Sequence, residues 1–297
     1  MLDARATLVA RYFDAFQAGE VGGVDWELLR VSSGGAGRVV AETGIRGRGS
    51  ATGLTTDATA GWLIAFAGDR VSEAIMYESF DEALLAGRRR AFAEARLYFV
   101  CDPVPEGRLL DAALRGGVDV LQLREKAPRC AEELISFSAP FARAAGEHGA
   151  LFILNDRPDL VEACAADGVH IGQDDEPVAV ARARAGPTAV VGLSTHTPQQ
   201  LDAARSASGD DRPDQISVGP VWETPTKEGR PASGLKLVEH AAADDDPPWF
   251  AIGGIDASNV GEVVAAGAKR IVVVRAIRDA ADPEAAARTL RAALPEQ

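Results

Sequence analysis

Cysteine is scarce in this chain, and the scarcity excludes a class of protein. The 297 residues include three cysteines, Cys101, Cys130 and Cys164, and no two of them form a CxxC pair. An odd and sparse set does not provide the disulfide framework of a small secreted domain, and it fits a reducing compartment. We therefore expect a cytoplasmic protein.

Long apolar runs are absent as well. No segment approaches the roughly 20 apolar residues that a membrane helix needs. The N-terminal sequence MLDARATLVARYFDAF contains acidic side chains and lacks the apolar run of a signal peptide. The sequence predicts neither a membrane span nor a secreted product.

Basic side chains are outnumbered by acidic ones, 31 Lys and Arg against 44 Asp and Glu, so the formal net charge is -13. Such an acidic chain is not expected to bind nucleic acid or an anionic membrane. It can still bind an anionic metabolite, since Lys, Arg, helix N-termini or a metal ion reverse the field inside one pocket. The expected partners are small phosphorylated molecules, and the sequence leaves a homo-oligomer open.

The first 94 residues follow a pattern of their own. Apolar spacing predicts a helix, three strands and a second helix, at residues 6–18, 38–45, 60–68, 71–79 and 80–95. We therefore expect a small α+β domain over residues 1–94. Its segment GDRVSEAIMYESFDEALLAG resembles the end of SnoaL-like (NTF2-like) domains, which implies a partial domain of that kind.

From Leu97 onward, a strand-then-helix pattern repeats eight times. Each predicted strand is a short run of Val, Ile, Leu or Phe, typical of parallel strands buried on both faces. Eight such units in about 200 residues predict a (β/α)8 TIM barrel of the α/β class over residues 95–297. The rival doubly wound sheet usually has a Gly-rich first turn, and the segment 102-DPVPEGR lacks GxGxxG.

In TIM barrels, functional side chains gather at the C-terminal ends of the strands. The second predicted strand ends in Gln122, Arg124 and Lys126, whose alternate spacing directs all three toward the barrel axis. Two cations and an amide on one face suit a polyanion, because Arg can grip phosphate oxygens with two hydrogen bonds. We predict an anion site here.

Acidic side chains end the next two strands. Asn155 and Asp156 follow the third strand, and Asp174 and Asp175 follow the fourth. Carboxylates from neighbouring strand ends can hold Mg²⁺, which prefers oxygen ligands and substrate phosphates. The sequence therefore predicts Mg²⁺ as the cofactor, next to the anion site.

The last four strands supply donors for a second anion. In the segment 192-GLSTH, Ser194 or His196 can face the pocket, and the segment 222-WETPTKEG is rich in hydrogen-bond donors. Strands seven and eight end in Gly253-Gly254 and Val274-Arg275, where this fold usually binds phosphate. Two anion pockets predict two phosphorylated substrates.

No catalytic triad is apparent in the sequence. The other histidines, His148, His170 and His240, show no shared metal-ligand spacing, and we interpret each as a surface or core residue. The predicted chemistry therefore relies on cations rather than on a protein nucleophile.

This ordered set of motifs resembles the thiamine phosphate synthase family. The matching pieces are QLREK, ND, GVHIGQDD, GLSTH, TPTK, AIGGI and VVVRAI, in the family's order over residues 96–294. The resemblance implies a transferase of thiamine biosynthesis. It would join the diphosphate of 4-amino-5-hydroxymethyl-2-methylpyrimidine to a thiazole phosphate, giving thiamine phosphate and pyrophosphate.

The resemblance also implies a role for each matching residue. The pyrimidine diphosphate would be bound by Gln122, Arg124, Lys126, Asn155, Ser194 and Lys227. The thiazole phosphate would be bound by Thr224, Thr226, Gly254, Val274 and Arg275, and Mg²⁺ by Asp156 and Asp175. The family commonly has Ser where Arg275 stands, so the geometry there is not inherited.

Two alternatives remain at this point. A thiazole tautomerase of the same barrel superfamily would need a proton-transferring residue, for which His196 is the candidate. It would not need the full diphosphate-binding set, which is present here. The other alternative is a non-catalytic barrel that binds phosphorylated ligands.

Overall fold

The computed structural model describes residues 2–18, 24–48, 55–104, 107–127, 129–223 and 232–296. The chain divides into two compact units, Met1–Ala91 and Phe92–Gln297. Helix α2 contains the boundary between them, because it spans Phe80–Glu94.

The first unit is built on a four-stranded antiparallel sheet in the order β1-β2-β3-β4. Its elements are α1 (Leu2–Ala18), β1 (Val24–Ser33), β2 (Val39–Arg48), β3 (Thr55–Ala67), β4 (Arg70–Tyr77) and most of α2. The α+β prediction for this region is confirmed, and the sequence analysis overlooked only β1. In β1 a bulge between Leu28 and Arg30 breaks the apolar alternation that reveals a strand.

Apolar side chains alternate across this sheet, and each face packs against a helix. Val9 and Phe13 of α1 pack against Val39 and Ile64 on one face. On the opposite face Val40, the next residue along β2, packs in a cluster with Leu63 and with Phe80, Ala83 and Leu84 of α2. Period-two alternation therefore gives this sheet an apolar layer on both sides.

The second unit is a closed barrel of eight parallel strands, with β5 to β12 in sequence order around it. The strands are β5 (Leu97–Cys101), β6 (Val120–Leu123), β7 (Leu151–Asn155), β8 (Gly168–Ile171), β9 (Val190–Thr195), β10 (Gln215–Val218), β11 (Trp249–Ile252) and β12 (Ile271–Val273). The TIM-barrel prediction is confirmed.

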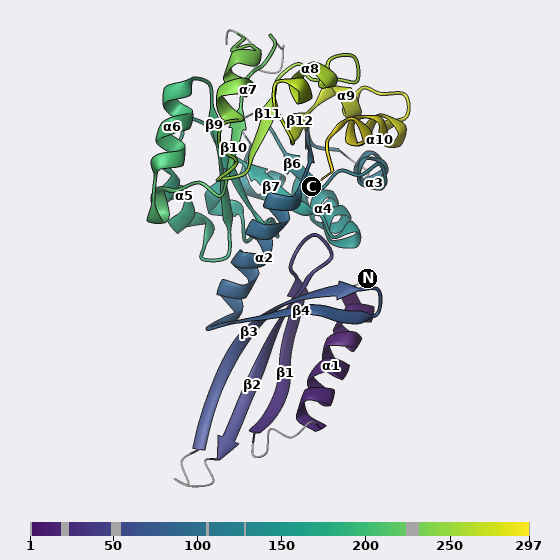
Figure 1. Ribbon diagram of the computed structural model, residues 1–297, viewed down its shortest axis with the longest axis vertical. Coiled ribbons are helices and arrows are strands. Elements are labelled where there is room, and N and C mark those ends of the chain that lie inside the picture. Colours follow the sequence, from purple (N-terminus) through teal and green to yellow (C-terminus); the bar gives the residue numbers. More distant parts are fainter. Residues whose placement is uncertain are drawn as a thin grey trace. The chain divides into compact units, whose positions relative to one another are not determined.

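Helices lie around the strands, as Figure 1 shows. They are α3 (Arg108–Arg115), α4 (Ala131–His148), α5 (Val178–Ala185), α6 (Pro198–Ser206), α7 (Leu235–Ala241), α8 (Val260–Ala265), α9 (Arg275–Arg278) and α10 (Pro283–Ala293), with short 3₁₀ turns at Pro158–Leu160 and Gly209–Asp211. Strand residues such as Phe99, Leu121 and Phe152 belong to the main apolar cluster, which also contains Leu110 and Phe141 of the helices. This layer holds the strand ends in fixed positions.

Aromatic rings fill the barrel near the beginnings of the strands. Phe92, in the last turn of α2, meets Phe250 edge-on with 6.3 Å between ring centroids. Tyr98 meets Phe250 edge-on at 5.7 Å, and all three side chains are buried. These rings form the floor beneath the strand ends, where the candidate site lies.

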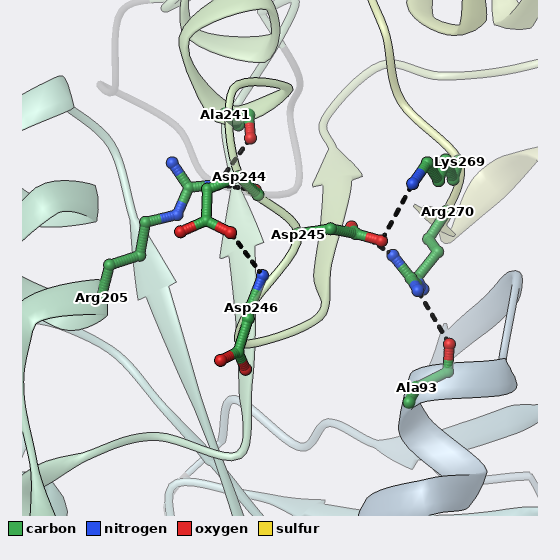
Figure 2. A network of polar contacts seen from close by, with 8 residues as sticks. All are labelled: Ala93, Arg205, Ala241, Asp244, Asp245, Asp246, Lys269 and Arg270. Atoms are coloured by element: carbon green, nitrogen blue, oxygen red, sulfur yellow. Dashed lines mark hydrogen bonds and ion pairs between the residues drawn. The ribbon is translucent and has the colours of Figure 1, made fainter.

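Charged side chains join the end of α2 to the loops at the same end of the barrel (Figure 2). Arg270 donates to Asp245 Oδ1 at 2.6 Å and to the carbonyl oxygen of Ala93 at 2.8 Å. Arg205 donates to the carbonyl oxygens of Ala241, at 2.5 Å, and of Asp244. Because Arg270 is almost fully buried, its two hydrogen bonds are shielded from water, and they tie Ala93 to the residue that precedes β12.

Candidate active site

A cavity of about 290 Å³ lies inside the barrel and opens at the C-terminal ends of the strands. Every strand contributes to its wall, with Tyr98, Gln122, Asn155, His170, Ser194, Ser217, Ile252 and Val272. Both polar and apolar side chains therefore line the cavity. This is where TIM-barrel enzymes carry their chemistry.

Gln122 and Arg124, from β6 and the residues after it, both line this cavity. Gln122 is buried, and its Nε2 donates to the Tyr98 hydroxyl at 2.5 Å. Burial raises the pKa of Tyr98, so its hydroxyl stays neutral. The sequence analysis missed Tyr98, which fixes the orientation of the Gln122 amide.

The Arg124 guanidinium has no direct polar contact with the described residues. It forms no hydrogen bond or ion pair with any of their side chains or backbone groups, although it is partly buried in the cavity wall. Burial lowers the pKa of Arg124, and the carboxylates of Asp156 and Asp102 partly oppose this effect. A partly desolvated guanidinium without a direct partner is complementary to an anionic ligand.

Lys126 lies in an adjoining pocket rather than in the main cavity. This pocket of about 400 Å³ is also lined by Arg124, Arg275 and Arg278, together with Asp102. Arg278 is already paired with Asp102 at 2.8 Å. The predicted face of Gln122, Arg124 and Lys126 thus extends over two connected hollows, which share Arg124.

Asp156 and Asp175 bring two carboxyl groups together beside this cationic wall. Asp156 follows β7 with φ 58°, a left-handed conformation that Asp tolerates better than most residues. Asp175 accepts a hydrogen bond from the Gly172 backbone N–H at 2.7 Å. Desolvation, and next the negative charge of Asp175, raise the pKa of Asp156 to about 6.

This acid pair fits a divalent cation. Two carboxylates held close together repel one another unless a cation or a proton lies between them. Within the described ranges no group of three or more His, Cys, Asp and Glu side chains gathers as a metal cluster. A pair of carboxylates suits Mg²⁺, which prefers oxygen ligands and usually keeps several waters.

The two side chains predicted at the end of β9 have separate environments. Ser194 lines the cavity, whereas His196 is not among the lining residues. The His196 ring shares a hydrogen bond of 2.5 Å between Nδ1 and the Gly219 carbonyl oxygen. His196 therefore holds the backbone after β10 and is poorly placed to transfer protons in the cavity.

His170 has a position in the cavity that its sequence context does not reveal. The interpretation as a surface or core histidine agrees with its burial, and the residue also lines the cavity, with its Nε2 3.0 Å from Ser194 Oγ. Strand register carries the missing signal, because His170 is paired with Asn155 of β7. Paired residues on parallel strands face the same side, so an inward Asn155 implies an inward His170.

Gly253 and Gly254 form the part of the cavity wall that follows β11. Both have positive φ, 107° and 69°, which glycine alone adopts readily. A Cβ on Gly254 would lie 2.9 Å from the Trp222 Cβ, so no larger residue fits without a shift. Val274 and Arg275 complete this wall, as the sequence analysis predicts for a phosphate site.

The Arg275 guanidinium forms no hydrogen bond or ion pair with the described part of the chain. Asp256 also lines the cavity, and its pKa is lowered chiefly by hydrogen bonds from Ser258 and to a smaller extent by the charge of Arg275. The sequence analysis did not single out Asp256. Thr224, Thr226 and Lys227 lie outside the described residues.

A closed (β/α)8 barrel with cations and an acid pair at its strand ends defines an enzyme that acts on small phosphorylated molecules. None of the described helices has the length and apolar character of a membrane span.

Within that class, the chain belongs to the thiamine-phosphate synthase family. The family profile described as thiamine monophosphate synthase matches residues 97–277. The thiamine-phosphate synthase of Acidothermus cellulolyticus is 51% identical over 211 residues, which cover 69% of this chain and 98% of that protein. That of Mycobacterium tuberculosis is 49% identical, with 68% and 96% covered.

A solved structure agrees with these relatives. The thiamine phosphate pyrophosphorylase from Pyrococcus furiosus superposes with a TM-score of 0.60 at 29% identity, and the match covers 68% of this chain and 96% of that one. The predicted family and its transferase activity are confirmed, and the tautomerase and the non-catalytic barrel are set aside. Residues before Leu97 lie outside the family match, and their SnoaL-like character stays a prediction.

Proposed function

We propose that this enzyme joins 4-amino-2-methyl-5-(diphosphooxymethyl)pyrimidine to a thiazole phosphate by a Mg²⁺-assisted dissociative substitution. The observation that carries the proposal is that the Arg124 guanidinium lies near the acid pair without a direct contact of its own. The Arg124 side chain has no hydrogen-bond or ion-pair partner among the described residues, and the neighbouring Asp156 has a pKa raised to about 6. A partly buried guanidinium without a direct partner and two adjacent carboxylates are both unfavourable when no ligand is bound, and both are complementary to a magnesium diphosphate.

The pyrimidine diphosphate is assigned to the side of the cavity formed by β6 to β9. Gln122, Asn155 and Ser194 line one space there and supply polar atoms for the aminopyrimidine ring. Arg124 links this space to the adjoining pocket, which also contains Lys126. In this assignment the two cations bind the diphosphate, and Lys227 joins them by its place in the family motif.

Asp156 and Asp175 are the residues that would hold Mg²⁺. When bound, the ion would neutralise charge on the diphosphate and make it a better leaving group. The hydrogen bond from Gly172 N–H to Asp175 orients that carboxylate. Asp174, the other acidic candidate, is not needed in this pair.

The reaction begins when the bond between the pyrimidine methylene carbon and the diphosphate oxygen breaks. The electron pair leaves with pyrophosphate, and the positive charge on the methylene carbon spreads into the aminopyrimidine ring. Arg124 and Lys126 stabilise the charge that develops on the leaving oxygens. The thiazole nitrogen then donates its lone pair to the methylene carbon, so no protein nucleophile is required.

The thiazole phosphate is assigned to the part of the cavity that follows β11 and β12. Gly254, Val274 and Arg275 line it, and Thr224 and Thr226 belong to the same set by their motif. Val274 and Arg275 also line the adjoining pocket that contains Arg124 and Lys126, so the two phosphate-binding regions are neighbours. Arg275 supplies a full positive charge where the family commonly has a neutral Ser. Binding two substrates side by side in one cavity provides the proximity that a two-substrate reaction needs.

The cytoplasm is the proposed setting for this reaction. All three cysteines are free thiols, and two of them, Cys101 and Cys164, are buried. A reducing compartment keeps such thiols reduced. The partners in this account are the two phosphorylated substrates.

Isotope exchange tests the dissociative step. With oxygen-18 in the bridge between the methylene carbon and the diphosphate, bond breaking and return should scramble the label into the non-bridging oxygens of the same phosphate. An unreactive thiazole phosphate analogue should be present, so that the cation returns to pyrophosphate. Turnover with the true thiazole phosphate but no scrambling with the analogue would indicate a concerted displacement instead.

A further inference from the structure

Buried polar side chains form a row across strands β8, β9 and β10 inside the barrel. The strand register pairs His170 with Gly192, and Gly192 with Gln215. Ser194, two residues beyond Gly192 on β9, faces the same interior and lines the cavity. His170 and Ser194 are only 7% and 6% exposed, and Gln215 is fully buried.

The glycine in the middle of this row leaves space between two polar atoms. A Cβ added to Gly192 would lie 2.5 Å from His170 Nδ1 and 2.5 Å from Gln215 Oε1. These two atoms therefore border one small space above the Gly192 Cα. Gln215 Nε2 donates to Ser217 Oγ at 3.0 Å, which leaves the carbonyl Oε1 at the edge of this space without a hydrogen-bond donor among the described residues.

A buried carbonyl oxygen that borders the same space as Nδ1 and has no donor favours the imidazole tautomer with its proton on Nδ1, because that tautomer directs an N–H rather than a lone pair into the space. In that tautomer Nε2 is an acceptor. Because Nε2 lies 3.0 Å from Ser194 Oγ, the serine hydroxyl is the donor of this hydrogen bond. The lone pairs of Oγ are then left for the cavity, so Ser194 presents an acceptor to whatever binds there.

We propose that His170 is a positioning residue that turns the Ser194 hydroxyl so that Oγ accepts a hydrogen bond from the amino group of the aminopyrimidine. This inference rests on the proposed function and deepens it. The thiazole phosphate and the diphosphate offer no N–H group, whereas the exocyclic amino group offers two. The amino group is therefore the part of the two substrates that matches a buried acceptor.

The contact also has a consequence for the rate. As the methylene carbon becomes positive, the amino nitrogen releases electron density into the ring, and its N–H groups become stronger donors. A fixed acceptor then binds the transition state more tightly than the ground state. Loss of the contact should lower kcat by a larger factor than it raises KM.

Binding of unreactive ligands isolates the contact from the chemistry. The probes are the hydroxymethylpyrimidine monophosphate with its amino group and the same compound with hydrogen in that place. Their ratio of dissociation constants at pH 8 measures the preference for the amino group. It should fall about tenfold in His170→Leu and in Ser194→Ala, because each removes the oriented acceptor.

Two variants serve as matched comparisons. His170→Gln places an amide oxygen near the position of Nε2, so it should keep most of the preference. Thr195→Val removes a neighbouring buried hydroxyl that donates to the Ser217 carbonyl oxygen and does not line the cavity, so the preference should stay unchanged. An undiminished preference in a folded His170→Leu variant, or equal losses in His170→Gln and His170→Leu, would overturn the proposal.

The tautomer can be measured without any substrate. Nitrogen-15 NMR of the full chain should show His170 with a protonated Nδ1 and an unprotonated Nε2, the signal being assigned by its loss in His170→Gln. A protonated Nε2 would overturn the proposal even if His170→Leu does not fold. Wild-type turnover separates the two claims: failure to release pyrophosphate refutes the proposed function, whereas turnover with the wrong tautomer refutes only the role of His170.

Discussion

Phe92 and Phe250 meet edge-on, with ring centroids 6.3 Å apart, and the contact joins the end of helix α2 to the floor of the barrel. Phe92 is 1% exposed although it precedes the first barrel strand. Phe92 also contacts Tyr98, with 6.3 Å between ring centroids, and the Tyr98 hydroxyl accepts the hydrogen bond from Gln122. A residue outside the family match at Leu97 onward is thus in direct contact with a cavity-lining side chain.

Replacing Phe92 by Ala should destabilise the barrel. Removal of a fully buried phenyl ring typically lowers the free energy of unfolding by about 3–5 kcal/mol. Urea-induced unfolding, monitored by the loss of activity, would measure this decrease in the free energy of unfolding. Phe92→Leu is the control variant, because it keeps most of the side-chain volume. Equal midpoints for wild type and Phe92→Ala would show that this ring is not part of the floor.

Asp175→Asn should nearly abolish turnover. The substitution removes one carboxylate of the acid pair, and a loss of about 100-fold or more is expected for a ligand of a catalytic metal. Pyrophosphate release measured against Mg²⁺ concentration tests this expectation, and Asp174→Asn is the matched control on the adjacent residue. Normal turnover in Asp175→Asn, or an equal loss in Asp174→Asn, would refute the assignment of Asp175.

Arg124→Ala should lower kcat/KM by about 10²–10³, because a preorganised charge at the leaving group is lost. Arg124→Lys should recover part of the activity, since it keeps the charge but not the two-pronged geometry. Arg143→Ala, at an exposed ion pair with Glu147, is the control and should behave as wild type. Wild-type kinetics in Arg124→Ala would contradict the assignment of the diphosphate to the part of the cavity that Arg124 lines.

Gly254→Ala should impair binding of the thiazole phosphate more than binding of the pyrimidine diphosphate. The new Cβ would lie 2.9 Å from the Trp222 Cβ, at a position with φ 69°, so the loop after β11 must move. Separate KM values for the two substrates provide the measurement. Gly261→Ala on α8 is the control, because a Cβ there meets no atom within 4 Å. A larger rise in the KM for the pyrimidine diphosphate would reverse the assignment of the two walls.

Much of the architecture could be predicted because its signals are local. The apolar runs from Leu97 to Lys269 are bounded by helical segments, and their order alone predicts parallel strands that close into a barrel. Strand β1 escaped prediction because its pattern breaks at the bulge between Leu28 and Arg30. A bulge changes the side on which following side chains lie, so alternation no longer indicates one face.

The site was predictable at its charged residues and not at its neutral ones. Arg124 and Asp156 stand out in sequence, since charge at a buried strand end requires an explanation. Tyr98 and His170 do not stand out, because a single aromatic residue or histidine in a strand usually belongs to the core. Their roles depend on register between strands, such as the pairing of His170 with Gly192, which one strand alone does not encode.

The central claim is that the cations and the acid pair at these strand ends expel pyrophosphate when both substrates are bound. The most direct measurement is pyrophosphate release by the purified full chain with Mg²⁺, each substrate alone and both together. The account predicts equal amounts of pyrophosphate and thiamine phosphate with both substrates, no thiamine phosphate with either alone, and loss of turnover when the metal is chelated. Binding of both substrates without release of pyrophosphate in the presence of Mg²⁺ would contradict it.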